Sequence, residues 1–145
     1  MKNPTAIAGA DDGKVMVVDE YNSSRNVRMF SEHGQHLFKF KVEGSLSFAD
    51  VAFYSGYVIV AGIETGKHCL RMLVYTKDGR AFVRSTKINV EGLDCLRGIT
   101  VNTKGCFGII AGFLREHPTN PDSDSFITPS NAFLDGEHDY KVLVV

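Results

Sequence analysis

The chain has 145 residues, of which 43% are hydrophobic and 23% charged, and its formal net charge is −1. This balance supports a packed core, and it argues against a disordered chain and against a strongly basic nucleic-acid binder. No apolar run approaches the roughly 20 residues of a membrane helix, and Met1-Lys-Asn-Pro4 leads into a polar turn without a signal-peptide core. We therefore expect one soluble cytoplasmic domain with no membrane contact.

The cysteines of the chain are Cys69, Cys95 and Cys106. Their odd number gives no paired framework, and none of them belongs to a Cys-x-x-Cys motif. We expect reduced, partly buried thiols.

One sequence unit occurs three times along the chain. Each copy has a short apolar strand, a turn with a glycine and a second apolar strand. The turn glycines are Gly13, Gly56 and Gly105, at intervals of 43 and 49 residues. A later strand and turn also recur, with Gly34 and Gly79 separated by 45 residues. Periods of this size indicate propeller blades or another repeat array.

The first unit predicts four strands, near residues 5–10, 14–19, 26–31 and 36–41. Asp11-Asp-Gly13 is a strong hairpin signal, because Asp-Gly readily takes the positive φ angles of tight turns. The apolar run 15–18 is typical of a strand covered on both faces. Tyr21-Asn-Ser-Ser-Arg25 is a polar turn between the second and third strands.

The second unit predicts strands near residues 49–54, 57–61, 70–76 and 80–86. Glu64-Thr-Gly-Lys67 forms its middle loop, and Lys77-Asp-Gly79 forms its last turn. Val-Glu-Gly follows each of the first two units, at residues 42–44 and 90–92, which is a further sign of repetition.

The third unit predicts strands near residues 97–102, 106–111 and 141–145, and a long surface loop over residues 113–139. The loop holds three of the four prolines and keeps neither a helical nor a strand period. Asp135-Gly-Glu-His-Asp139 gathers carboxylates and an imidazole, but its spacing fits no metal loop, so we interpret it as a solvated hairpin loop. The chain as a whole is predicted to be all-β.

The first unit resembles an NHL repeat. The resemblance rests on Pro4-Thr-Ala-Ile-Ala, the Asp-Asp-Gly turn, Val15-Met-Val-Val-Asp19, Val27-Arg-Met-Phe30 and His33-Gly34. In the second unit Arg71-Met-Leu-Val-Tyr75 fits the third strand, whereas Ala61-Gly62 replaces the family's Val-Asp. In the third unit the fit is limited to residues 141–145.

The resemblance implies an NHL-type β-propeller arc, similar to the C-terminal domain of the tripartite-motif ubiquitin ligases. Its blades would cover about residues 1–44, 45–91 and 92–145, with the last blade incomplete. Such propellers usually have six blades, so we expect either two copies closing one ring as a homodimer, or a piece of a longer chain. An open arc would otherwise expose sheet faces and edges.

The implied function is a substrate-recognition module that binds a protein partner and is not itself an enzyme. The loops 20–26, 62–69 and 113–139 all join second to third strands and should emerge on one face. The candidate contact residues are aromatic, Arg and Lys side chains, and of these the aromatic and Arg side chains dominate interface energies. They are Arg25, Arg28, Lys67, Arg71, Phe113, Arg115, Phe126 and Lys141.

Two other functions stay open. A single-stranded RNA-binding propeller would use a basic rim, with the net charge of −1 and the acidic run 122–124 as arguments against it. A metal-dependent propeller lyase or lactonase would need ligands in the central channel. Because the sequence has no nucleophile, phosphate-loop or zinc-protease motif, we expect no catalytic residues, no metal and no cofactor.

Overall fold

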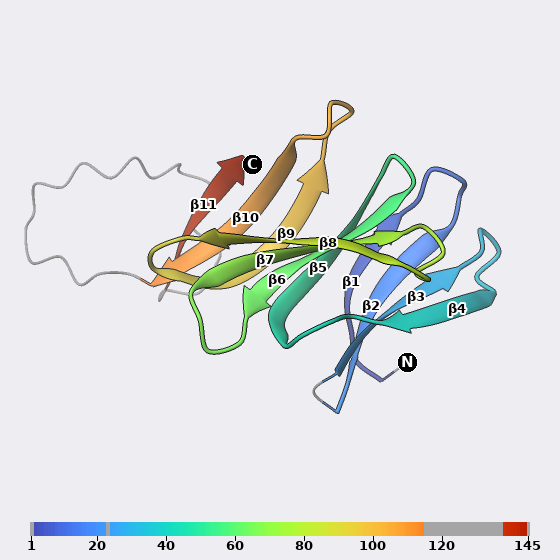
Figure 1. The fold of residues 1–145 in the computed structure, drawn as a ribbon, viewed down its shortest axis with the longest axis horizontal. Helices are drawn as coiled ribbons and strands as arrows, with labels where there is room; N and C mark the ends of the chain where they lie inside the picture. Colours follow the sequence, from blue (N-terminus) through green and yellow to red (C-terminus); the bar gives the residue numbers. More distant parts are fainter. Residues whose placement is uncertain (1, 23, 115–137, 145) are drawn as a thin grey trace, which may run out of the picture.

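The computed structural model describes residues 2–22, 24–114 and 138–144, and in these ranges the chain is all-β with three antiparallel sheets. The sheets stand side by side in chain order, with the second sheet in the middle (Figure 1). The first sheet contains β1 (Pro4–Gly9), β2 (Val15–Tyr21), β3 (Ser24–Phe30) and β4 (His36–Lys41). The second contains β5 (Leu46–Tyr54), β6 (Tyr57–Glu64), β7 (Cys69–Thr76) and β8 (Phe82–Asn89). The third contains β9 (Leu93–Val101), β10 (Phe107–Leu114) and β11 (His138–Val144), in the order β11-β10-β9.

The predicted strands are confirmed within the described residues, and the predicted turns between them are confirmed by their geometry. Gly13 and Gly105 have φ angles of 77° and 83° and close equivalent turns, in which each donates its N–H to the carbonyl oxygen three residues earlier. Ser55 and Gly56 both have positive φ, as a two-residue type I′ hairpin requires. The repeat glycines therefore sit where the backbone must be left-handed.

The loops between second and third strands are shorter than predicted. Residues 20–26 and 62–69 were expected to be loops, but Glu20 pairs with Arg25 across β2 and β3, and β6 continues to Glu64. Cross-strand pairing satisfies backbone groups that an open loop would leave to water. In the third repeat β10 runs to Leu114 and β11 starts at His138, and the rest of the predicted loop 113–139 lies outside the described residues.

The registers of the three sheets contain equivalent pairs. Ile7 of the first strand faces Val17 of the second, and the corresponding pairs are Val51 with Val60 and Ile99 with Ile109. The three first strands also lie next to one another, since β5 contacts both β1 and β9. The sheets thus meet along their first strands and fan outward, as Figure 1 shows.

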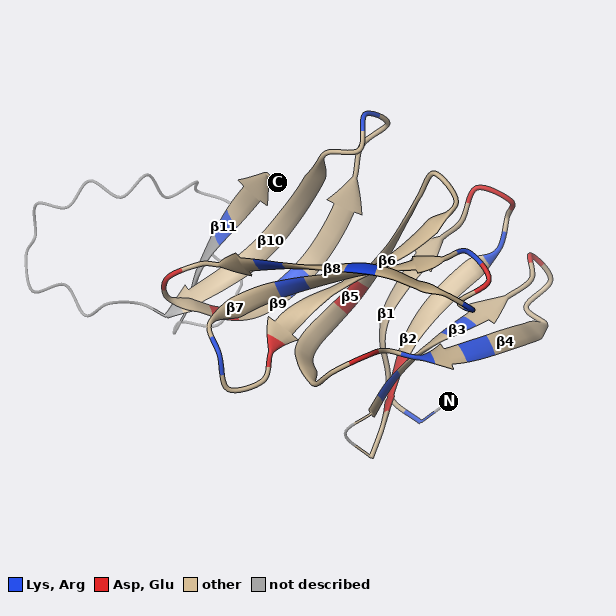
Figure 2. Ribbon diagram, viewed as in Figure 1, with Lys and Arg blue, Asp and Glu red and all other residues tan. Residues whose placement is uncertain are grey.

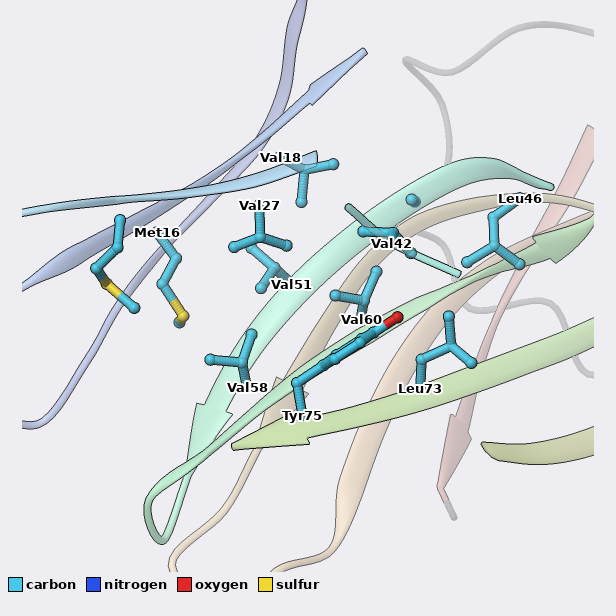
Figure 3. Close-up of a cluster of buried hydrophobic side chains, with 12 residues drawn as sticks. Met16, Val18, Val27, Val42, Leu46, Val51, Val58, Val60, Leu73 and Tyr75 are labelled. Carbon is cyan, nitrogen blue, oxygen red and sulfur yellow. The ribbon is translucent and has the colours of Figure 1, made fainter. Parts of the chain in front are cut away.

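The core of the molecule lies between the sheets. Side chains of the first and second sheets form one cluster, which includes Met16, Val18, Val27, Val60 and Tyr75 (Figure 3). A second cluster, which includes Ile59, Leu70 and Ile109, lies between the second and third sheets. Burying each such side chain stabilises the fold by roughly 1.5–3 kcal/mol, so packing between sheets dominates the stability.

Phe40 is an outer contact between the first two sheets. Its ring centroid lies 4.9 Å from that of Tyr75, and a Cβ atom on Gly79 would overlap the Phe40 ring. Gly34 occupies the equivalent turn of the first sheet with φ 78°, close to the 68° of Gly79, but a Cβ there would meet nothing within 4 Å. The two glycines therefore share a backbone conformation and differ in their neighbours.

We expect Gly79→Ala to destabilise the protein more than Gly34→Ala. Both substitutions place a side chain at positive φ, which costs about 1 kcal/mol, but only Gly79→Ala also displaces Phe40, at a further cost of roughly 1–3 kcal/mol. Urea unfolding of the two variants measures the difference. Equal destabilisation would contradict the packing of Phe40 against the turn of the second sheet.

Asp19 is a carboxylate buried completely at the end of β2. It accepts hydrogen bonds from the backbone N–H groups of Lys2 and Asn3, at 3.0 and 3.1 Å, and from Nε of Arg28 at 2.8 Å. Burial alone would raise the pKa of Asp19, but these donors outweigh it and hold the pKa below the ordinary 3.8. The carboxylate therefore fastens the N-terminal segment and β3 to β2.

We expect Asp19→Asn to lower the free energy of unfolding at neutral pH by about 2 kcal/mol, because the Arg28 guanidinium loses its anionic partner. A carboxyl whose pKa is lowered by folding stabilises the protein above its unfolded pKa, and this contribution disappears as the pH falls through the folded pKa. The difference between wild type and variant should therefore shrink below about pH 4. Urea titrations over a pH series measure it, and a difference independent of pH would contradict the ion pair.

Candidate functional site

A cavity of about 450 Å³ lies beside the first strands of the three sheets, between the start and the middle of each strand. Its lining draws on all three sheets and combines an aromatic ring, guanidinium groups, carboxylates and hydroxyls. The lining residues are Thr5, Glu20 and Arg25 of the first sheet, Ser47, Phe48, Ala49 and Asp50 of the second, and Leu96 and Arg97 of the third. We call it the Phe48 pocket.

Phe48 has an unusual backbone for a large side chain. Its φ angle is 51°, in the left-handed region that costs an L-residue roughly 1–2 kcal/mol, and its side chain is 51% exposed. The strain coincides with a bulge, because the pairing of β5 with β6 shifts register between Ser47 and Asp50. A strained backbone that holds an aromatic ring in solvent is unfavourable for folding alone, and such strain clusters at binding sites.

Opposite charges balance in the Phe48 pocket. Arg25 donates from Nη2 to Oε2 of Glu20 at 3.2 Å, while its Nε is buried and has no acceptor among the described residues. Asp50 lies across the pocket and accepts the backbone N–H of Ile99 at 2.7 Å, which links the second sheet to the third. The pocket thus offers one buried donor and an exposed ring, with its carboxylates already engaged by protein donors.

A second exposed aromatic side chain lies at the end of β2 and is not part of the pocket lining. Tyr21 follows Glu20, is 45% exposed and carries the ammonium group of Lys2 over its ring, 4.5 Å from the centroid. Such cation–π contacts leave the other ring face open to a partner.

Of the predicted contact residues that the structure describes, Arg25 alone lines this pocket. Arg28 is held by the buried Asp19, and Arg71 donates from Nε to Oγ of Ser85 at 3.0 Å. Lys67 lies in the turn after β6 and forms an ion pair with Glu64 at 2.9 Å. Hydrogen bonds from Lys87 and from Lys67 lower the pKa of Glu64 to about 2, which keeps this cluster ionic.

The remaining predicted contact residues lie at the third sheet or outside the described residues. Phe113 is 8% exposed in the second core cluster, and the ammonium group of Lys141 lies 4.9 Å from its ring centroid. This pair is a packed contact between β10 and β11, so the Phe113 ring offers little surface to a partner. Arg115 and Phe126 lie outside the described residues, as does most of the acidic segment 135–139.

Sequence reasoning missed the central residue of the site. Strand alternation predicts that Ala49, Val51 and Phe53 point to one face of the strand. It predicts that Leu46 and Phe48 both point to the opposite face. Leu46 is nevertheless buried and Phe48 exposed, because the bulge changes the phase. The break in alternation between residues 46 and 49 was the available signal.

Comparisons with known proteins assign no family, since no family model and no curated protein matches the sequence. Among the described residues, no helix has the length and apolar character to cross a membrane, and no three His, Cys, Asp or Glu side chains form a group that could hold a metal ion. The NHL resemblance therefore stays a prediction.

We expect Phe48→Gly to be more stable than Phe48→Ala by about 1 kcal/mol, although glycine usually destabilises strands. Both variants lose the ring, but only glycine adopts a φ of 51° without strain. Urea unfolding of the two variants is the measurement. A more stable alanine variant would show that residue 48 does not hold the left-handed conformation.

Proposed function

We propose that this chain is a cytoplasmic protein-interaction module, in which the three sheets are blades of an NHL-type propeller arc and the Phe48 pocket binds a segment of a protein partner. The equivalent pairs of Ile7, Val51 and Ile99, together with the contacts between first strands, support the blade interpretation. Aromatic residues and small insertions at the mouths of such arrays commonly carry binding, because a rigid scaffold positions them.

The observation that carries the proposal is the exposed ring of Phe48, which a strained backbone holds in a pocket that Arg25 also lines. An aromatic ring gains most from a partner that removes it from water, since interface hot spots are rich in aromatic and arginine side chains. The Nε of Arg25 would gain as well, because a buried donor without an acceptor costs about 1–3 kcal/mol. A peptide with an apolar or aromatic side chain and an adjacent carbonyl or carboxylate oxygen satisfies both groups.

The charge pattern favours a protein segment over RNA. RNA binding depends on several unneutralised cations that contact phosphates. In the Phe48 pocket the two guanidinium groups are matched by the two carboxylates of Glu20 and Asp50. Figure 2 shows the acidic residues of β2 and β5 beside the basic residues of β3, the strands that surround the pocket.

Selection from a displayed random peptide library against the immobilised chain tests the proposal. We expect enriched peptides that contain an aromatic or large apolar residue, and we expect Phe48→Ala to weaken their binding at least tenfold, which is about 1.4 kcal/mol and typical of a hot spot. Phe48→Gly should weaken it equally while remaining the more stable variant. Fluorescence anisotropy with a labelled selected peptide is the measurement.

Tyr57→Ala is the matched control. Tyr57 is 42% exposed, belongs to the same sheet and lies at the hairpin that ends β5, away from the pocket at the start of that strand. Its removal should leave peptide affinity unchanged. If the two variants weaken binding alike, or if the chain enriches no peptide but binds a random single-stranded RNA pool with strong salt dependence, the proposal is wrong.

A further inference from the structure

The third sheet exposes residues that are buried at the equivalent positions of the other sheets. Ile110, Val142 and Val144 are 47%, 68% and 77% exposed. Ile110 pairs with Val142, and Gly108 pairs with Val144, on the face turned away from the second sheet. These exposed side chains are all apolar, and no described part of the chain covers them.

The register shows what covers this face elsewhere. Ile110 follows Ile109, just as Val18 follows Val17, so the pair Ile110–Val142 is equivalent to Val18–Val27 of the first sheet. Val18 and Val27 are fully buried because the second sheet packs on them. The equivalent pair of the second sheet, Ala61 and Met72, is buried against the third sheet in the same way. At both interfaces between sheets within the chain, therefore, one face of a sheet is covered by the opposite face of the sheet that follows it.

The opposite end of the molecule carries such a face, on which no described sheet packs. Val51, in the second sheet, is 2% exposed because the first sheet covers it, and Ile99 packs into the cluster shared with the second sheet. Their equivalent in the first sheet is Ile7, which is 70% exposed. One chain thus presents both halves of an interface that it forms twice internally, one half at each end.

We propose that a second copy of this chain covers these ends, with the third sheet of each copy packing on the first sheet of the other. The contact continues the existing sheet-to-sheet packing and is head-to-tail, so each copy uses two different faces. The number of copies rests on the propeller interpretation proposed above. Propellers have about four to eight blades, so two arcs of three sheets close a ring and three arcs exceed the range.

The edge of the third sheet adds a second contact to the same assembly. Its described strands end at β11, whereas β4 and β8 cover the equivalent edges of β3 and β7. An uncovered strand edge binds another strand through backbone hydrogen bonds. Among the described strands, the end that presents the apolar face therefore also carries an edge strand, β11, without an outer neighbour.

Light scattering coupled to size exclusion tests the proposal on the full 145-residue chain. The expected mass is twice the 16.0 kDa of one chain. Val142→Glu and Ile7→Glu should each reduce it to one chain, because a head-to-tail pair needs both faces. Val83→Glu is the control, since Val83 is 46% exposed on the outermost strand of the second sheet and lies on neither end face.

Mixing the two end variants tests the direction of the contact. A mixture of Ile7→Glu and Val142→Glu chains retains one unaltered contact between the third sheet of the first variant and the first sheet of the second. At raised concentration the two-chain species should return, although neither variant forms it alone. Unchanged circular dichroism of each variant confirms that the exposed substitutions leave the fold intact.

Four results would overturn the inference: a wild-type chain that stays at the mass of one copy at every concentration, an assembly that grows beyond two copies, a mass sensitive to only one of the end variants, or a mixture that never recovers the two-chain species. Growth beyond two copies would show head-to-tail contacts that do not close into a ring. A mass sensitive to only one end variant would show a contact between identical faces. The mass is measured without peptide, so failure here is distinct from failure of peptide binding at the Phe48 pocket.

Discussion

Burial of both faces of the second sheet is the interaction on which the rest of the structure depends. Successive residues of β6 point alternately into the two clusters, with Val58 and Val60 toward the first sheet and Ile59 and Ala61 toward the third. A strand of this kind has no polar face, so a one-residue slip would cost little in burial, unlike a slip in a half-exposed strand. Its register must come from the type I′ hairpin at Ser55-Gly56 and from the bulge in β5.

The bulge in β5 connects this packing to the candidate site. By shifting the phase of the strand it turns Asp50 toward the third sheet, where the carboxylate accepts the N–H of Ile99 at the edge of β9. The same shift places Phe48 in the pocket, with its backbone at positive φ. One local irregularity therefore satisfies a backbone donor between sheets and exposes an aromatic ring, and the hydrogen bond helps to offset the strain of the ring's position.

Much of this fold could be predicted from the sequence, because turn chemistry and alternation are local properties. Each Gly turn marks a strand end, and the burial of residues 16–18 follows from their apolar composition. The site was harder to predict, because its properties arise from contacts between repeats. Arg28 and Phe113 are residue types that often contact partners. Arg28, however, is bound by the buried carboxylate of Asp19, and Phe113 is packed into the second core cluster. The exposure of Phe48 depends on a bulge that simple alternation does not represent.

The position of the Phe48 pocket gives the proposed pairing a functional consequence. The pocket lies between the start and the middle of the first strands, and these are the strands along which the sheets meet. In a closed ring the two copies are related by a rotation about the ring axis. The same ends of their first strands therefore lie on the same face of the ring. Two copies would therefore present two Phe48 pockets side by side on one face, and a partner with two suitable segments would bind through both. The second segment then binds at the high effective concentration set by its linker, so a weak pocket can serve a strong interaction without any additional contact.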